Sequence, residues 1–426
     1  MVRSATEKAL ATQAEPNPTA VDWSELPPEL LQTIAEKLIT HTDYLRFRAV
    51  STTWRLSTPT NPLHLPTQLP WLMLPFNQTR RSTQGATRHV LVDGLGQRKK
   101  ITGTSRPFFS LSAIKSHSLH LPESSPHQRR RHRGSSHGYL AFLDESPDFF
   151  LLNPLTRAKF HLPPLSSFPN VVAFDFSDVG REYSLRASNG DVSTRSLSEM
   201  RDLFIKKVVL SSSPSVDFNF IVLAILNQTG DLAFCKNGYR SWLFIEDAQS
   251  YCEDAIYCNG LFYAVNKLGQ IAVCDVTGEF PRVSFIRMPP QIGGDLLYLV
   301  SLSSNELLLV TRYLDLEILD YGTREFRVYR LDLSGPKWER VTSLGDQMLF
   351  LGENSSVALS ASDFPGCKGN CIYYTDDYSE LNYDGMAGNH DLGVYNLEDG
   401  SIDPLPCCYS LPRMRWPPIW VTPNPC

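Results

Sequence analysis

The segment VYRLDLSGPKWERV, residues 328–341, shows the local pattern that decides the fold. An apolar strand ends at Asp332, the chain turns at Ser334, and a second strand begins within a few residues. Three more segments share this pattern: LLNPLTRAKFHLPP (151–164), AVCDVTGEFPRVSFIRMPP (272–290) and GVYNLEDGSIDPLP (393–406). We therefore expect four β-hairpins, three of them with a glycine of positive φ in the tight turn, at Gly278, Gly335 and Gly400.

The four segments recur at a regular spacing. Their anchoring residues follow one another about every 60 residues, with one gap twice that size: Asn153, Asp275, Asp332 and Asn396. Helical periodicity almost vanishes after residue 58, and short apolar runs are separated by Gly, Asn, Asp, Ser and Pro. The pattern predicts a mainly β fold, an irregular β-propeller of about six blades, with a pair of β-sandwiches as the alternative. Residues 71–76 and 416–421 are candidates for strands that pair and close the ring.

Helical spacing of apolar residues is confined to residues 26–55, LPPELLQTIAEKLITHTDYLRFRAVSTTWR. The first part predicts an amphipathic helix, because four apolar residues share one face: Leu30, Leu31, Ile34 and Leu38. We expect Thr42 or Asp43 to cap a second helix, and Ser51 to cap a third turn that holds Trp54. Three short helices bury little surface, so an apolar face should dock either on a partner or on the rest of the chain.

The order of apolar residues in this segment closely resembles the F-box. The residues that carry the resemblance are Leu26, Pro27, Leu30, Leu31, Ile34, Leu38, Leu45, Val50 and Trp54. The chain departs from the common pattern at Ser51, where many family members have Cys. The resemblance implies a trihelical module that binds a Skp-type adaptor through these residues and, through that adaptor, joins a cullin-based ubiquitin ligase.

A second resemblance covers most of the chain more loosely. GYLAF from Gly138, the pair Asn153-Pro154 and the prolines after it are similar to a plant family that joins an F-box to a kelch-like domain. The resemblance implies a substrate-recognition subunit, whose β domain captures an unknown protein for ubiquitination. The alternatives are a non-ligase β-propeller scaffold and a ligand-binding propeller.

Composition predicts a flexible leader at 1–21, and the two resemblances imply an F-box module at 22–57 and a kelch-like propeller at 58–426. The net charge of −5 is small, and no apolar run is long enough to span a bilayer, so we expect neither a nucleic-acid nor a membrane partner. An odd number of cysteines, nine, and the absence of a secretory pattern in the first 20 residues indicate free thiols inside the cell. We expect the nucleus or the cytoplasm.

A basic run comprises Arg129, Arg130, Arg131 and Arg133. It lies between Ser-Pro and Gly-Ser-Ser stretches, which predicts an exposed, mobile loop near residues 124–137 of the propeller domain. The run is a candidate nuclear-import signal, and a solvated loop without a further role is the alternative.

Known signatures of catalysis are missing from the sequence, which has no phosphate-binding loop, nucleophile elbow or zinc-protease helix. Cys367 and Cys371 are followed by His390, Cys407 and Cys408, but this spacing lacks the two tight pairs that structural zinc usually takes. We therefore expect no catalytic residue, no metal and no cofactor, and predict a non-catalytic adaptor subunit.

Overall fold

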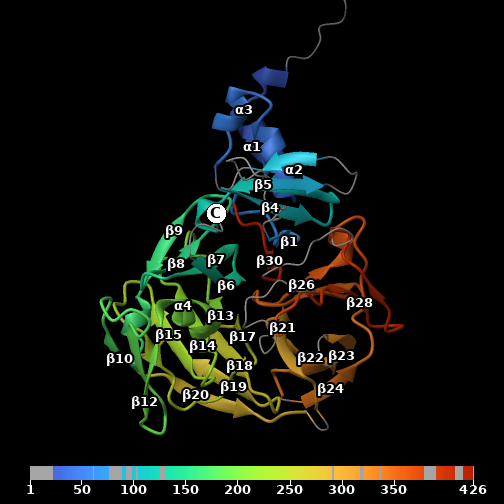
Figure 1. The fold of residues 1–426 in the computed structure, drawn as a ribbon. Coiled ribbons are helices and arrows are strands. Elements are labelled where there is room, and N and C mark those ends of the chain that lie inside the picture. The colour runs from blue at the N-terminus through green and yellow to red at the C-terminus, as the bar shows by residue number, and fades with distance from the viewer. Residues whose placement is uncertain are drawn as a thin grey trace, which may run out of the picture. The chain divides into compact units, whose positions relative to one another are not determined.

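The computed structural model describes residues 23–60, 62–75, 89–92, 98–101, 104–124, 130–289, 292–316, 321–335, 337–378, 390–407 and 416–425. The chain forms two compact units, Met1–Pro66 and Thr67–Cys426. Figure 1 shows that the first unit is helical and that the second is built from β-sheets. The structure divides the chain after Pro66, whereas the sequence predicts a boundary after residue 57. The functional limits of the two domains stay a prediction. The expected leader, residues 1–21, lies outside the described residues.

The helical unit contains η1 (Trp23–Glu25), α1 (Pro28–Ala35), α2 (His41–Arg48) and α3 (Thr52–Leu56). The predicted caps of α2 at Thr42 and Asp43 are wrong, because the helix begins earlier and the Thr40 side chain accepts the Asp43 N–H. The cap at Ser51 is confirmed, since its hydroxyl accepts the Trp54 N–H at 3.2 Å. The unit has its own small core of buried side chains: Leu31, Ala35, Tyr44 and Phe47.

Among its described residues, the second unit contains six sheets of four or five strands, which we number as blades 1 to 6. Blade 1 has the order β30-β1-β4-β5, formed by Ile419–Val421, Trp71–Met73, Ser105–Ser110 and Lys115–His120. Blade 2 consists of β6 to β9, formed by Arg130–Ser136, Tyr139–Asp144, Phe149–Leu152 and Lys159–Leu162. Blade 3 consists of β13 to β16, formed by Ile205–Leu210, Ile221–Leu226, Leu232–Lys236 and Leu243–Phe244.

Blades 4 to 6 continue the ring in chain order, as the yellow to red ribbons of Figure 1 show. Blade 4 consists of β17 to β20, formed by Asp254–Cys258, Leu261–Val265, Ile271–Asp275 and Arg282–Ile286. Blade 5 consists of β21 to β24, formed by Leu296–Ser303, Glu306–Leu316, Tyr321–Asp332 and Lys337–Val341. Blade 6 has the order β26-β25-β27-β28-β29, formed by Val357–Ser360, Gln347–Leu351, Cys371–Tyr374, Gly393–Asn396 and Ile402–Asp403.

The remaining elements are small. A three-stranded sheet consists of β10 to β12, formed by Val171–Phe174, Tyr183–Arg186 and Val192–Arg195, and a hairpin consists of β2 (His89–Val92) and β3 (Arg98–Ile101). The short helices are η2 (Pro122–Ser124), η3 (Leu165–Ser167), α4 (Leu197–Glu199), the π-helical turn η4 (Met200–Phe204) and η5 (Ala361–Asp363). None of the helices in the described part of the chain has the length and apolar character that a bilayer-spanning helix needs.

Hydrophobic cores between neighbouring blades close the ring. In the described part of the second unit, six clusters of buried apolar side chains each join one blade to the next, and one of them joins blade 6 back to blade 1. β14 shows how one strand serves two cores: Leu223 packs toward blade 4, while Val222 and Ala224 pack toward blade 2. Successive side chains of a strand point to opposite faces, and both faces are covered here, so the strand is apolar throughout. The predicted β-propeller is confirmed, and the β-sandwich alternative is wrong.

The two ends of the second unit complete one blade together, as the sequence suggested. β30 pairs antiparallel with β1, and Leu72 lies opposite Trp420 in this register. β30 is the edge strand of blade 1 that contacts β6 of blade 2. Trp420 packs into the core between blades 6 and 1, whereas Ile419 and Val421 pack into the core between blades 1 and 2. One short strand therefore supports both sides of its blade.

The four predicted hairpins are confirmed as β8-β9, β19-β20, β23-β24 and β28-β29. In each turn the anchoring Asn or Asp side chain accepts a backbone N–H two residues later, from Leu155, Thr277, Ser334 and Glu398. The expected positive φ occurs at Gly400 but not at Gly278 or Gly335, and Arg157 takes a φ of 66° in the turn that lacks glycine. Side-chain capping by Asn or Asp is thus what the four turns share.

Candidate functional site

The candidate docking surface lies on the helical unit. α1 divides its apolar residues between two faces, since Leu31 is buried while Leu30 and Ile34 are 51% and 42% exposed. Leu30 and Ile34 are four residues apart, so they lie one turn apart on the same side of the helix. Leu45 of α2 is 50% exposed, and Val50, just beyond that helix, is 60% exposed. Several exposed large apolar side chains on so small a unit are typical of a unit that a partner covers.

The structure sorts the nine predicted adaptor-binding residues by burial. Five are exposed (Pro27, Leu30, Ile34, Leu45 and Val50), three are half-buried (Leu26, Leu38 and Trp54), and Leu31 is fully buried. Leu31 therefore belongs to the core of the unit and is corrected from a contact residue to a supporting one. Sequence reasoning missed the exposed Ile39 and Leu56. Leu56 lies just beyond Trp54-Arg55, where the resemblance to the F-box ends, so the motif gives no signal for it.

The basic run is a strand and not a loop. Arg130–Ser136 form β6, an edge strand of blade 2, and Arg131, His132 and Arg133 are buried. The guanidinium of Arg131 stacks 3.8 Å from the ring centre of Trp416, and Arg130 pairs with the carboxylate of Asp144 on β7. The expectation of a mobile loop near 124–137 is therefore wrong, because an aromatic ring and carboxylates hold these arginines inside the propeller.

The structure also argues against the interpretation of this run as a nuclear-import signal. An import receptor needs an accessible basic peptide, whereas Arg131 and Arg133 lie on a buried strand. Arg129, the first residue of the run, lies outside the described residues. The signal that could have corrected the prediction is the pair His137-Gly138, which separates β6 from β7 with positive φ at both residues, as a tight hairpin turn requires.

A buried ion pair and its hydrogen bonds link four blades. Lys207 Nζ of blade 3 lies 2.5 Å from Asp254 Oδ1 of blade 4, and both side chains are almost fully buried. Lys207 also donates to the backbone oxygen of Gly352, which follows β25 of blade 6, at 3.3 Å. Asp254 accepts the backbone N–H of Leu299 in blade 5 at 3.0 Å. The pair therefore ties these blades together, and removing one partner would leave the other charge buried.

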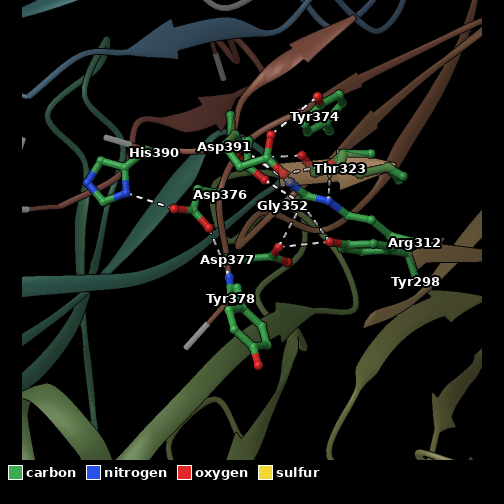
Figure 2. A network of polar contacts seen from close by, with 12 residues as sticks. Tyr298, Arg312, Thr323, Gly352, Tyr374, Asp376, Asp377, Tyr378, His390 and Asp391 are labelled. Carbon is green, nitrogen blue, oxygen red and sulfur yellow. Dashed lines mark hydrogen bonds and ion pairs between the residues drawn. The ribbon is translucent and has the colours of Figure 1, made fainter. Parts of the chain in front are cut away.

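Figure 2 shows a larger polar network around Arg312 of β22, whose side chain is fully buried. Its guanidinium donates to the Asp391 carboxylate at 2.7 Å, to Thr323 Oγ1 at 2.7 Å and to the backbone oxygen of Thr375 at 3.1 Å. Burial opposes the charge, but the surrounding hydroxyl and carboxylate groups raise the pKa of Arg312 above its usual value. Asp377 lies farther from the guanidinium, at 3.4 Å.

The neighbouring Asp376 extends this network. It accepts hydrogen bonds from the Tyr321 hydroxyl and, at 3.1 Å, from the Tyr378 backbone N–H, and it lies 2.8 Å from His390 Nδ1. The partners belong to blade 5 and to the segments that flank residues 379–389, so the network holds those segments against the blade (Figure 2). Within the described residues, no three His, Cys, Asp or Glu side chains are arranged to hold a metal ion.

The network predicts an unusual pH dependence at Asp377. Burial raises the pKa of Asp377 to about 6, so the folded state holds this proton more tightly than the unfolded chain does. Ionisation of Asp377 therefore costs stability as the pH rises toward and through about 6. Relative to the native chain, Asp377→Asn should become progressively more stable between about pH 4.5 and pH 7, measured by urea unfolding.

Asp332→Asn is the control for this measurement. Hydrogen bonds from the Ser334 hydroxyl and N–H lower the pKa of Asp332, so its stabilising contribution is present at neutral pH and is lost as the pH falls. Because that loss occurs only below about pH 4, the stability difference of Asp332→Asn from the native chain should stay nearly constant between pH 4.5 and pH 7, while that of Asp377→Asn rises. A constant difference between Asp377→Asn and the native chain across this range would contradict the prediction.

Comparisons with known proteins agree with this architecture. The family model of the KIB1-4 β-propeller matches residues 108–396. The F-box protein SKIP23 of Arabidopsis thaliana is 29% identical over 436 residues, which cover 94% of this chain and 96% of that protein. A second F-box protein of the same plant is 30% identical and covers 65% of this chain and 72% of its own length.

Solved structures resemble the chain only distantly. The Cps50 (Swd1) β-propeller domain of Myceliophteria thermophila is 10% identical, with a TM-score of 0.33, and the match covers 78% of this chain and 88% of that one. The assignment therefore rests on the family model, the plant relatives and the six closed blades. The chain belongs to the KIB1-4 β-propeller family, as a plant F-box protein whose second unit is the propeller.

Proposed function

We propose that this chain is the substrate-recognition subunit of an SCF-type cullin ubiquitin ligase. The observation that carries the proposal is that the helical unit, which already has a core of its own, leaves four large apolar side chains exposed: Leu30, Ile34, Leu45 and Val50. Such side chains are available to a Skp-type adaptor, which would link the chain to a cullin. The F-box proteins among the relatives support the same assignment.

In this proposal the propeller captures the protein to be ubiquitinated, and the chain acts by proximity. Holding a substrate beside a charged ubiquitin-conjugating enzyme raises the effective concentration of the reacting groups, so this chain needs no nucleophile of its own. The role is therefore that of a non-catalytic adaptor, acting in the nucleus or the cytoplasm. The kelch-like character expected of the propeller stays part of the proposal, since the matching family model is that of the KIB1-4 β-propeller.

Separating the two units tests the proposal. The full chain should co-purify with a Skp-type adaptor, whereas residues 67–426 should not, because they lack the exposed apolar surface. The truncated chain should still show a β-type circular dichroism spectrum and one cooperative melting transition, because its six cores lie between its own blades. A full chain that folds but does not bind the adaptor would favour a non-ligase scaffold.

A further inference from the structure

A pocket in the propeller lies where the basic strand β6 meets blade 1. It is a small pocket with a cavity volume of about 40 Å³, and it is partly open to solvent. Three of its lining residues are arginines, Arg106 of β4 together with Arg130 and Arg131 of β6, and Phe142 and Trp416 add apolar surface. The only carboxylate among the described lining residues belongs to Glu353.

That carboxylate is shared by several groups at distances too long for good hydrogen bonds. Glu353 Oε1 lies 3.9 Å from Arg131 Nη2 and 3.8 Å from Arg133 Nη1, and Oε2 lies 3.8 Å from His132 Nδ1. The imidazole of His132 lines the pocket, and within the described residues its buried Nδ1 has no hydrogen-bond partner. Buried polar atoms are normally paired, so this nitrogen marks a position where a ligand oxygen would be held.

The electrostatics of the cluster favour an anion. Burial, followed by repulsion from Arg133, lowers the pKa of Arg131 to about 9, and burial alone lowers the pKa of Arg106 to about 9. Burial and the neighbouring arginines also lower the pKa of His132 well below its usual value, so its ring is neutral and can donate one N–H. These shifts mean that positive charge is crowded into a desolvated space, which an incoming anion would relieve.

We propose that this pocket binds a phosphate monoester, held by the guanidinium groups of Arg106 and Arg131 and by Nδ1 of His132. Guanidinium groups match the oxygens of phosphate in a fork geometry. The lining arginines outnumber the single Glu353, so a group that carries nearly two negative charges fits better than a carboxylate with one. The site lies wholly in the second unit, so the proposal does not depend on adaptor binding by the first.

Isothermal titration calorimetry on the full chain at constant ionic strength tests the proposal. Inorganic phosphate should bind and an equal concentration of acetate should not. Arg131→Gln should weaken phosphate binding about tenfold or more, since it removes a charge-assisted contact. Arg282→Gln makes the same charge change at an exposed site on β20, away from the pocket, and should bind phosphate as the native chain does.

Glu353→Gln gives a second test, whose expected result is tighter binding and therefore cannot arise from misfolding. It removes the negative charge that competes with the ligand, so phosphate should bind several-fold more tightly, about tenfold at most. The proposal is overturned if no phosphate binding is detected at millimolar concentration, if acetate binds equally well, or if Arg131→Gln and Arg282→Gln behave alike.

A phosphoserine peptide and its unphosphorylated form distinguish the two sources of the phosphate. Tighter binding of the phosphopeptide than of inorganic phosphate, lost in Arg131→Gln, would assign the pocket to a phosphorylated protein side chain. Binding of inorganic phosphate without binding of the phosphopeptide would assign it to a small phosphate ester. Both outcomes support a phosphate site.

Discussion

Deletion of residues 416–426 is expected to leave the propeller without a cooperative unfolding transition. These residues contain β30, which pairs with β1 and completes blade 1. The deletion would strip Trp420 from one inter-blade core and Ile419 and Val421 from another, and it would expose the edge of β1. In a closed ring every blade packs against two neighbours, so an open ring loses packing on both sides of the gap. Urea unfolding followed by circular dichroism measures the effect.

Point variants of Trp420 separate packing from strand pairing. Trp420→Ala should cost about 3 to 5 kcal/mol of unfolding free energy, since the side chain is almost fully buried between blades. Trp420→Phe should cost much less, because it keeps a ring in the core and the indole N–H has no hydrogen-bond partner within the described residues. Phe280→Ala, at an exposed position, is the control and should be nearly neutral. A truncated chain that unfolds as cooperatively as the native one would contradict this account of ring closure.

The sequence could predict the hairpins and the closure because their determinants are local. An Asn or Asp that caps its own turn, as at Asp332, is visible in a window of a few residues. The closing strands could also be found, since Trp71 and Trp420 stand in short apolar runs at opposite ends of a repeating domain. The sequence could not give the order of blade 6, where β25 pairs parallel with β27 and the chain between them forms β26.

The burial of charged residues inside the propeller could not be predicted from the sequence, for a physical reason. A run of arginines normally lies in water, so the sequence predicts a loop at these positions. Arg131 and Arg133 are instead buried, because Trp416 and Glu353 lie beside them. Arg312 is likewise separated from Asp391 by 79 residues of sequence. Long-range pairing of this kind leaves no local periodicity, whereas the exposed and buried faces of α1 follow directly from helical spacing.

Replacement of Leu30 and Ile34 by Ser is expected to abolish stable binding of a Skp-type adaptor while the chain stays folded. Both side chains are about half exposed, so in the free chain they contribute little to the core. In a complex they would be buried together, and the loss of two apolar anchors costs about 3 kcal/mol, roughly a hundredfold in affinity. Calorimetric titration of the purified adaptor into the full chain measures this change in affinity.

Two further variants show whether adaptor binding is lost because the docking surface is changed or because the helical unit unfolds. Leu31→Ala removes a fully buried side chain of α1. It should therefore destabilise the helical unit by about 2 to 5 kcal/mol and weaken adaptor binding indirectly. Lys37→Ser changes an exposed polar position just after α1 and should leave both stability and affinity unchanged. The proposed docking surface requires that the Leu30 and Ile34 double variant keep the melting temperature of the native chain while losing the adaptor. If that variant still binds with native affinity, the adaptor contacts another surface, and the exposed side chains of α1 must have a different partner.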